Sequence, residues 1–225
     1  MDVLEEQIAY YRARAGEYDE WWQRSGRFDR GPQGNAQWFA EVEQLQHALA
    51  AFAPRGRVLE LACGTGIWSR ELARYADALT LVDSSPEVLA INAERVQHPH
   101  ITRIHADLFS WRPTQRYDVV FFSFWLSHVP PATFERFWAL VGDCLDSDGR
   151  AFFIDSLRYD GAGARDQAEP ERRTLNDGRV FNIVKVYYQP AELQAKLQAL
   201  GWRADVQTTP NYFLFGSATP MPRTL

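Results

Sequence analysis

Residues 60–66 read Glu-Leu-Ala-Cys-Gly-Thr-Gly and stand between an apolar run and a segment with helical spacing. Gly64 and Gly66 allow the main chain to approach a ligand where a Cβ would collide. A loop of this kind presents backbone N–H groups and the positive end of a helix to a polar or anionic ligand. The stretch therefore predicts a site for a nucleotide-like cofactor.

Acidic residues mark the ends of three successive apolar runs. Glu60 lies in the glycine motif, Asp83 ends the run 79–83, and Asp107 follows the run 101–106. Because the carboxyl ends of parallel strands meet at one crevice, we expect the three carboxylates to line it. An adenosyl cofactor offers them an amino group, a ribose diol and an exocyclic amine. The alternative for Asp83 and Asp107 is a helix cap.

The glycine spacing separates two kinds of cofactor. A dinucleotide fingerprint requires a third glycine at the position that Ser69 occupies. An NAD-type oxidoreductase is therefore disfavoured.

The elements that must position these residues alternate, as in a doubly wound α/β sheet. We expect seven strands, the last one antiparallel, over residues 57–62, 79–83, 101–106, 117–124, 150–156, 179–188 and 212–216. Helices are expected over residues 3–23, 37–52, 67–75, 86–96, 131–145 and 190–200. We divide the chain into a helical cap or lid over 1–53 and a cofactor-binding domain over 54–225, with an insertion over 157–178 that covers the site.

From about residue 57 to residue 216 the chain resembles the class I S-adenosylmethionine-dependent methyltransferases, which have a Rossmann-like fold. Residues 60–66 match the first motif of that family, with Ala62 where many members have glycine. The resemblance implies S-adenosyl-L-methionine (SAM) as the cofactor. Its implied ligands are Glu60 through loop geometry or a water, Ala62, Gly64 and Gly66 at the methionyl part, Asp83 and Ser84 at the ribose, Asp107 and Leu108 at the adenine, and Phe124.

The leading helix supplies further candidates. Tyr11, Tyr18 and Trp22 share one face of it, and in resembling enzymes such a helix closes over the cofactor with a tyrosine near the methionyl end. Arg14 lies on a neighbouring part of the helix and is a candidate for the cofactor carboxylate; an exposed arginine is the alternative.

Methyl transfer from a sulfonium is an in-line displacement, so the protein must align the acceptor and remove a proton only if the acceptor carries one. His128 follows the fourth expected strand and is the candidate base, because its ordinary pKa near 6.5 suits proton transfer at neutral pH. A helix cap or a structural packing role is the alternative for this histidine.

The acceptor side has weaker signals. Trp22, Trp38 and Trp125 are candidate walls of an acceptor site, with core packing as the alternative. Arg173, with Arg172 beside it and Arg179 across an expected turn at 176–178, is a candidate for binding a carboxylate or phosphate of the acceptor. A solvated hairpin face is the alternative.

Composition excludes several classes of protein. The net charge of -5 argues against nucleic acid as a substrate, and no segment is long and apolar enough to span a membrane. Cys63 and Cys144 have no zinc or redox spacing, and no metal site is expected. The pattern is typical of a cytoplasmic protein, a monomer or a homodimer.

Together these features favour a methyltransferase that transfers a methyl group from SAM to an O or N atom of a small-molecule acceptor. Two alternatives stay open: non-methylating sulfonium chemistry such as cyclisation, and a non-catalytic SAM-binding module.

Overall fold

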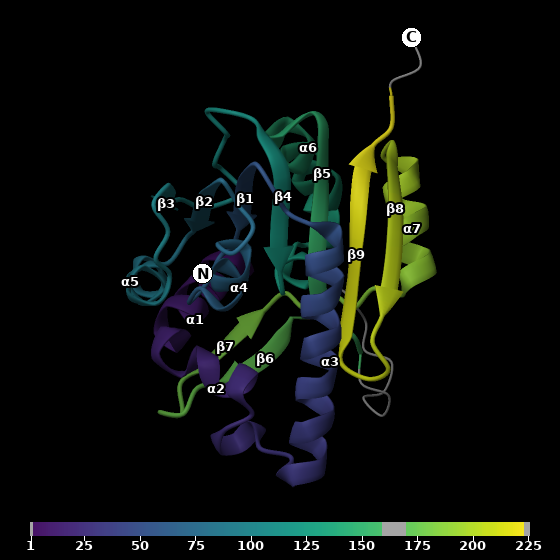
Figure 1. Ribbon diagram of the computed structural model, residues 1–225. Helices are drawn as coiled ribbons and strands as arrows, with labels where there is room; N and C mark the ends of the chain where they lie inside the picture. The colour runs from purple at the N-terminus through teal and green to yellow at the C-terminus, as the bar shows by residue number, and fades with distance from the viewer. Residues whose placement is uncertain (1, 159–169, 223–225) are drawn as a thin grey trace.

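The computed structural model describes residues 2–158 and 170–222 (Figure 1). Its central feature is a seven-stranded sheet with the strand order β3-β2-β1-β4-β5-β9-β8. The strands are β1 (Arg57–Leu61), β2 (Ala78–Asp83), β3 (Ile101–His105), β4 (Tyr117–Ser123), β5 (Leu145–Ser156), β8 (Trp202–Thr208) and β9 (Phe213–Pro220).

The sheet confirms the doubly wound α/β architecture. Strands β1 to β5 pair in parallel, whereas β9 is antiparallel to both β5 and β8. Since β8 runs in the direction of β1 to β5, β9 is the one antiparallel strand. The expected order reversal therefore lies between β1 and β4, where a ligand crevice forms in such sheets.

Helices cover both faces of the sheet because its central strands are apolar on both sides. In β1, Val58 packs into one hydrophobic cluster and Leu59 into another, and both are fully buried. Residues of α3 (Gly31–Phe52), α4 (Ile67–Leu72) and α5 (Pro86–Arg95) contribute to the cluster of Val58. Those of α6 (Phe134–Cys144) and α7 (Pro190–Ala199) contribute to the cluster of Leu59.

The leading segment is less continuous than its periodicity predicts. It forms α1 (Val3–Arg14), a 3-10 turn over Ala15–Glu17, α2 (Tyr18–Gln23) and a second 3-10 turn over Gly26–Phe28. Gly16 lies at the interruption, where a glycine costs a helix about 1 kcal/mol. The next helix, α3, begins at Gly31 rather than at residue 37, because Pro32 is tolerated in a first helical turn.

One strand prediction was wrong. Residues 179–188 were expected in the main sheet, but β7 (Val180–Ile183) pairs with β6 (Glu171–Thr174) in a separate antiparallel hairpin. The seventh strand of the main sheet is instead β8, at the edge of the sheet. Only Trp202 and Val206 of β8 are buried, and the polar residues around them hid the strand pattern in the sequence. The turn expected at 176–178 is present, with the Gly178 N–H donating to the Leu175 carbonyl at 3.0 Å.

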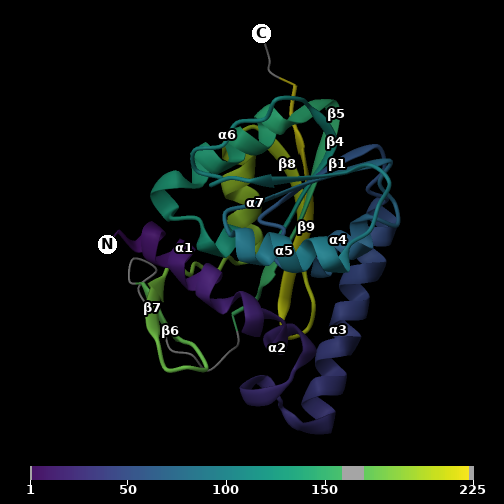
Figure 2. The same cartoon turned by 90° about the vertical axis from the view of Figure 1, so that its left-hand side faces the viewer.

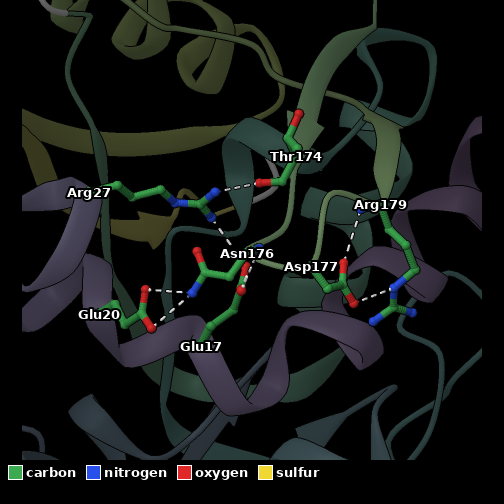
Figure 3. A network of polar contacts seen from close by, with 7 residues as sticks. All are labelled: Glu17, Glu20, Arg27, Thr174, Asn176, Asp177 and Arg179. Atoms are coloured by element: carbon green, nitrogen blue, oxygen red, sulfur yellow. Dashed lines mark hydrogen bonds and ion pairs between the residues drawn. The ribbon is translucent and has the colours of Figure 1, made fainter.

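The β6–β7 hairpin lies beside α1 and α2 (Figures 1 and 2). Figure 3 shows the polar contacts that join them: Arg27 bridges the Thr174 carbonyl and Glu17, and Asn176 binds Glu17 and Glu20. At the other end, the Asn182 N–H donates to Glu6 at 2.7 Å. These contacts make α1, α2 and the hairpin one cap over the carboxyl ends of the strands.

Part of the expected insertion over 157–178, namely residues 159–169, lies outside the described residues. The remainder holds β6 and the turn at 176–178. The division of the chain at residue 53 stays a prediction.

Candidate functional site

The glycine loop joins β1 to α4 and has an unusual backbone. Ala62, Gly64 and Gly66 all have positive φ, at 53°, 53° and 89°. A Cβ on Gly66 would lie 2.9 Å from the Asn92 amide and from Val96, so α5 packs against this residue as only glycine permits. On Gly64 a Cβ would meet nothing within 4 Å, so this side of the loop is open to a ligand.

Asp83 fastens the loop to the end of β2. Its carboxylate accepts the Gly64 N–H and the Ser85 N–H, each at 2.9 Å. Burial raises the pKa of Asp83, and these N–H donors oppose that rise. Both carboxylate oxygens retain lone pairs beside the loop, which suits a ligand hydroxyl.

Glu60 lies beneath the loop and is fully buried. Ser69 donates to its Oε2, while its Oε1 has no hydrogen-bond partner among the described residues. Burial raises the pKa of Glu60 to about 8, with the Ser69 hydrogen bond opposing and the nearby Asp83 reinforcing the rise. Because Glu60 is closed off from the open side of the loop, its side chain supports the loop from below.

A cavity of about 60 Å³ runs along the loop and under the cap. It brings together eight of the twelve expected cofactor ligands: Tyr11, Tyr18, Ala62, Gly64, Asp83, Ser84, Leu108 and Phe124. Val88 and Ser123 line it as well, and the sequence reading missed both, because neither belongs to a motif.

The other four expected ligands lie elsewhere. Glu60 and Gly66 support the loop from behind, and Asp107 turns its Oδ1 toward the Phe109 N–H at 3.1 Å. Arg14 lines a larger neighbouring cavity, where its guanidinium lies 4.9 Å from the centre of the Tyr18 ring.

His128 lies in a 3-10 turn over Leu126–His128 and is 5% exposed. Its Nδ1 is 2.7 Å from the Val184 carbonyl, so Nδ1 carries the proton and donates it. Its Nε2 then accepts the Tyr11 hydroxyl at 2.8 Å. Burial first, and then the charge of Lys185, lower the pKa of His128 well below its ordinary value, so the imidazole is neutral.

The larger cavity, of about 470 Å³, adjoins the first and shares Tyr11, Tyr18 and Phe124 with it. Its other walls come from α1, α2, the 3-10 turn at Gly26–Phe28, the β6–β7 hairpin and the segment that follows the hairpin. Six cationic side chains line it: Arg14, Arg27, Arg30, Arg172, Arg173 and Lys185. The described residues that line it include no aspartate or glutamate. We call this the cationic cavity.

The four residues expected on the acceptor side are scattered. Arg173 lines the cationic cavity, and Trp125 lines the smaller cavity. Trp22 lies beside the glycine loop. Trp38 is 3% exposed in the core, where its indole N–H donates to the Trp22 carbonyl, and it lines neither cavity. Arg179 pairs with Asp177 on the outer side of the hairpin turn (Figure 3).

A polar clasp joins the cap to the glycine loop. Asp19 of α2 accepts the Thr65 hydroxyl at 2.6 Å and forms an ion pair with Arg95 of α5. Arg95 also donates to the Thr65 hydroxyl oxygen at 3.0 Å. The clasp holds α2 over the cofactor cavity.

Comparisons with known proteins agree with this geometry. A methyltransferase domain family matches residues 58–149. The structure is similar to that of a DhpI–SAH complex, with 40% sequence identity over 98% of each chain and a TM-score of 0.79. A DhpI–SAM–HEP complex is 38% identical over 97% of this chain and 98% of that one, with a TM-score of 0.80.

A more distant structure shares the fold alone. The 1,6-didemethyltoxoflavin-N1-methyltransferase of Burkholderia thailandensis is 17% identical over 97% of this chain and 89% of its own, with a TM-score of 0.66. The comparison with curated protein sequences gave no match.

The glycine loop, the sheet order and these similarities define a class of enzyme. The chain belongs to the class I SAM-dependent methyltransferases, and SAM is its cofactor. Within the described residues, no group of histidine, cysteine and carboxylate side chains has the geometry of a metal site. None of the helices in that part of the chain is long and apolar enough to cross a bilayer.

Proposed function

We propose that this enzyme transfers the methyl group of SAM to an oxygen atom of a small acid that binds as its anion. One observation carries the proposal: six cationic side chains line a cavity of about 470 Å³ whose described lining residues include no carboxylate. That volume suits a small metabolite.

The charges of the cationic cavity are only partly neutralised. Arg27 forms an ion pair with Glu17, Arg173 with Glu171 and Lys185 with Asp155. Arg14, Arg30 and Arg172 have no ion pair with any carboxylate among the described residues, and the Arg14 Nε is buried without a hydrogen-bond partner. Arg14 is half-buried, and Arg30 and Arg172 are exposed, so their guanidinium groups are available for charge-assisted hydrogen bonds to a bound anion.

The proximity of the two cavities supports transfer between their ligands. Tyr11, Tyr18 and Phe124 belong to the lining of both, so a molecule in the cationic cavity lies next to one in the cofactor cavity. SAM supplies an electrophilic methyl group on a sulfonium. The chain's own residues hold the acid, exclude water and place an acceptor oxygen in line with that methyl group.

The state of His128 favours an oxyanion over an alcohol or amine. An alcohol or a protonated amine must lose a proton, and the one lone pair of the neutral His128 ring already accepts the Tyr11 hydroxyl. Lys185, Arg173 and Arg14 all disfavour a positive charge on His128. An acid that binds already ionised needs no base, because its oxygen forms the new bond to carbon as the sulfur–carbon bond breaks.

The relatives support a small acceptor. The DhpI structure that was solved with SAM and HEP aligns with nearly the whole of this chain, cap included. A second cavity beside the cofactor cavity favours an enzyme with an acceptor over a non-catalytic SAM-binding module. The six cations that line it favour a separate anionic acceptor over cyclisation within the cofactor.

The test is a panel of small carboxylates, phosphate monoesters and phosphonates, each offered with methyl-labelled SAM beside an amine and an alcohol of similar size. We expect label in at least one acid, and Arg173→Gln should raise the KM for that acid about tenfold or more. Arg179→Gln is the matched control, because this arginine pairs with Asp177 outside the cavity. Label in the amine or alcohol alone contradicts the proposal.

A further inference from the structure

One cation of the cationic cavity differs in chemistry from the other five. Among the 24 lysines and arginines of the chain, only Lys185 and Lys196 are lysines. An arginine keeps its charge in almost any surroundings, whereas a buried lysine loses its proton readily. The Lys185 side chain is 5% exposed, and burial lowers its pKa below the ordinary value. The charge of Lys185 therefore depends on what surrounds it.

Among the described residues, Asp155 is the carboxylate that forms an ion pair with that ammonium. It lies at the end of β5, its side chain is 4% exposed, and its Oδ1 is 3.7 Å from the Lys185 Nζ. Asp155 does not line the cavity itself, whereas Lys185 does, so Lys185 stands between this carboxylate and the acceptor site. Its attraction is the largest influence that opposes the effect of burial on the pKa of Lys185.

Asp155 also fixes where the ammonium lies. Its Oδ2 accepts the Ser127 N–H at 2.8 Å and its Oδ1 the Ser156 N–H at 2.7 Å. Lys185 in turn donates to the Ser127 hydroxyl oxygen at 2.7 Å and to that of Ser156 at 3.4 Å. The carboxylate thus fixes the backbone of both serines whose hydroxyl groups accept hydrogen bonds from Nζ.

The other charged and titratable groups near Lys185 do not replace Asp155. Arg173 on β6 disfavours the protonated lysine. Glu171 favours it, but Glu171 forms an ion pair with Arg173. His128 is neutral, and the Tyr187 ring lies 5.2 Å from Nζ with its phenol pKa raised by burial.

We propose that Asp155 is a positioning residue of the acceptor site, which keeps the Lys185 ammonium charged and fixed at the cavity wall without touching the acceptor. The inference rests on the proposed function, since it assigns to Lys185 the binding of an acceptor anion. The alternative is that Asp155 has only a structural role, in which its carboxylate caps the turn at Leu126–His128.

Kinetics separate the two roles. Asp155→Asn keeps the shape of the side chain and removes its charge. We expect the KM for the acid acceptor to rise about tenfold or more at pH about 9 and much less at pH about 7, with the Kd for SAM unchanged. An increase in KM that is the same at both pH values overturns the proposal. Asp205→Asn, the same substitution on the distant edge strand β8, serves as the control.

A second substitution sharpens the result. Lys185→Arg in the Asp155→Asn background restores a charge that does not titrate in this range. The alkaline increase in KM should then disappear, whatever the absolute KM. An alkaline increase that persists in the double variant assigns it to another group and contradicts the proposal.

A spectroscopic test needs no acceptor and so is independent of the proposed function. With two lysines in the chain, ¹³C-labelling of lysine gives two ε-carbon signals, and Lys196→Arg assigns them. The Lys185 signal should report a charged amine at pH about 8 in the wild type, move on addition of inorganic phosphate, and titrate at lower pH in Asp155→Asn. A neutral Lys185 in the wild type, or an unchanged titration in the variant, overturns the pairing.

If Asp155→Asn fails to fold, the wild-type signal alone decides. If no acid is methylated, the proposed function fails while this titration still tests the Asp155–Lys185 pair.

Discussion

The Tyr11 hydroxyl donates to the Nε2 of His128 across 2.8 Å, which joins the cap helix α1 to the turn that follows β4. The Nδ1 of the same ring donates to the Val184 carbonyl, beyond the hairpin. His128 therefore holds three separate segments together beside the smaller cavity, which it lines. Both ring nitrogens have hydrogen-bond partners, so we propose that His128, the candidate base of the sequence analysis, supports the site instead; its role as a base stays a prediction to be tested.

The first prediction concerns the pH profile of this pair. With an acid acceptor that is fully ionised, kcat of the wild type should show no ionisation near the ordinary histidine pKa of 6.5, because His128 stays neutral to lower pH. His128→Asn should lower kcat while the profile keeps its shape. A rising limb near pH 6.5 that vanishes in the variant would restore His128 as the general base.

Glu60 gives a prediction for stability. Its folded-state pKa of about 8 lies above the ordinary 4.5, so the folded protein binds a proton that the unfolded chain has released between these values. Stability from this source is present below pH 4.5 and is lost as the pH rises to 8. Without cofactor, the melting temperature of Glu60→Gln should therefore decline less than that of the wild type from pH 5 to pH 8. Parallel curves would show that Glu60 does not titrate in this range.

Asp83 should contribute directly to cofactor affinity. Asp83→Asn removes the charge and leaves one amide oxygen for the two N–H groups of Gly64 and Ser85. Calorimetry should show SAM and SAH both bound about tenfold to a hundredfold more weakly. Asp77→Asn, at an exposed position before β2, is the control. Undiminished affinity would remove Asp83 from the ribose site.

The clasp of Asp19, Thr65 and Arg95 should set how fast the product leaves. Asp19→Asn removes the ion pair with Arg95 that holds α2 over the cofactor cavity. Stopped-flow measurements should show SAH dissociating about five- to tenfold faster. Arg12→Gln breaks the exposed pair of Arg12 and Glu87 between α1 and α5, and it should have little effect. Equal rates in both variants would mean that the clasp does not limit release.

Much of the fold could be predicted because its signals are local. The apolar runs of β1, β2 and β4 are buried on both faces, and the glycine loop marks the join of β1 to α4. The strand β8 was not predicted, because an edge strand with one buried face shows only a short, weak alternation of buried and exposed residues. The alternating apolar residues of β7 predicted a strand of the main sheet. In the structure, Glu6 and Gln7 of α1 instead accept the N–H groups of Asn182 in β7 and of Val184 just after it.

The cofactor side of the site was more predictable than the acceptor side. Gly64, Asp83 and Leu108 lie next to strand ends, whose convergence follows from topology. Lys185, Arg27 and Arg30 come from separate segments that only the folded cap brings together, so no spacing in the sequence points to them. Arg173 was a candidate because it stands next to another arginine, and it lines the cationic cavity.

The atom that receives the methyl group decides whether the enzyme methylates an acid oxygen. The enzyme should be incubated with ¹³C-methyl SAM and the best acid of the panel, and the product examined by ¹³C NMR. We expect one signal, from a methyl group bonded to an acid oxygen. At acid concentrations below the wild-type KM, its formation should be about tenfold slower or more in Arg173→Gln and unchanged in Arg179→Gln. A methyl group on nitrogen or carbon, or equal formation with both variants, would contradict the proposed function.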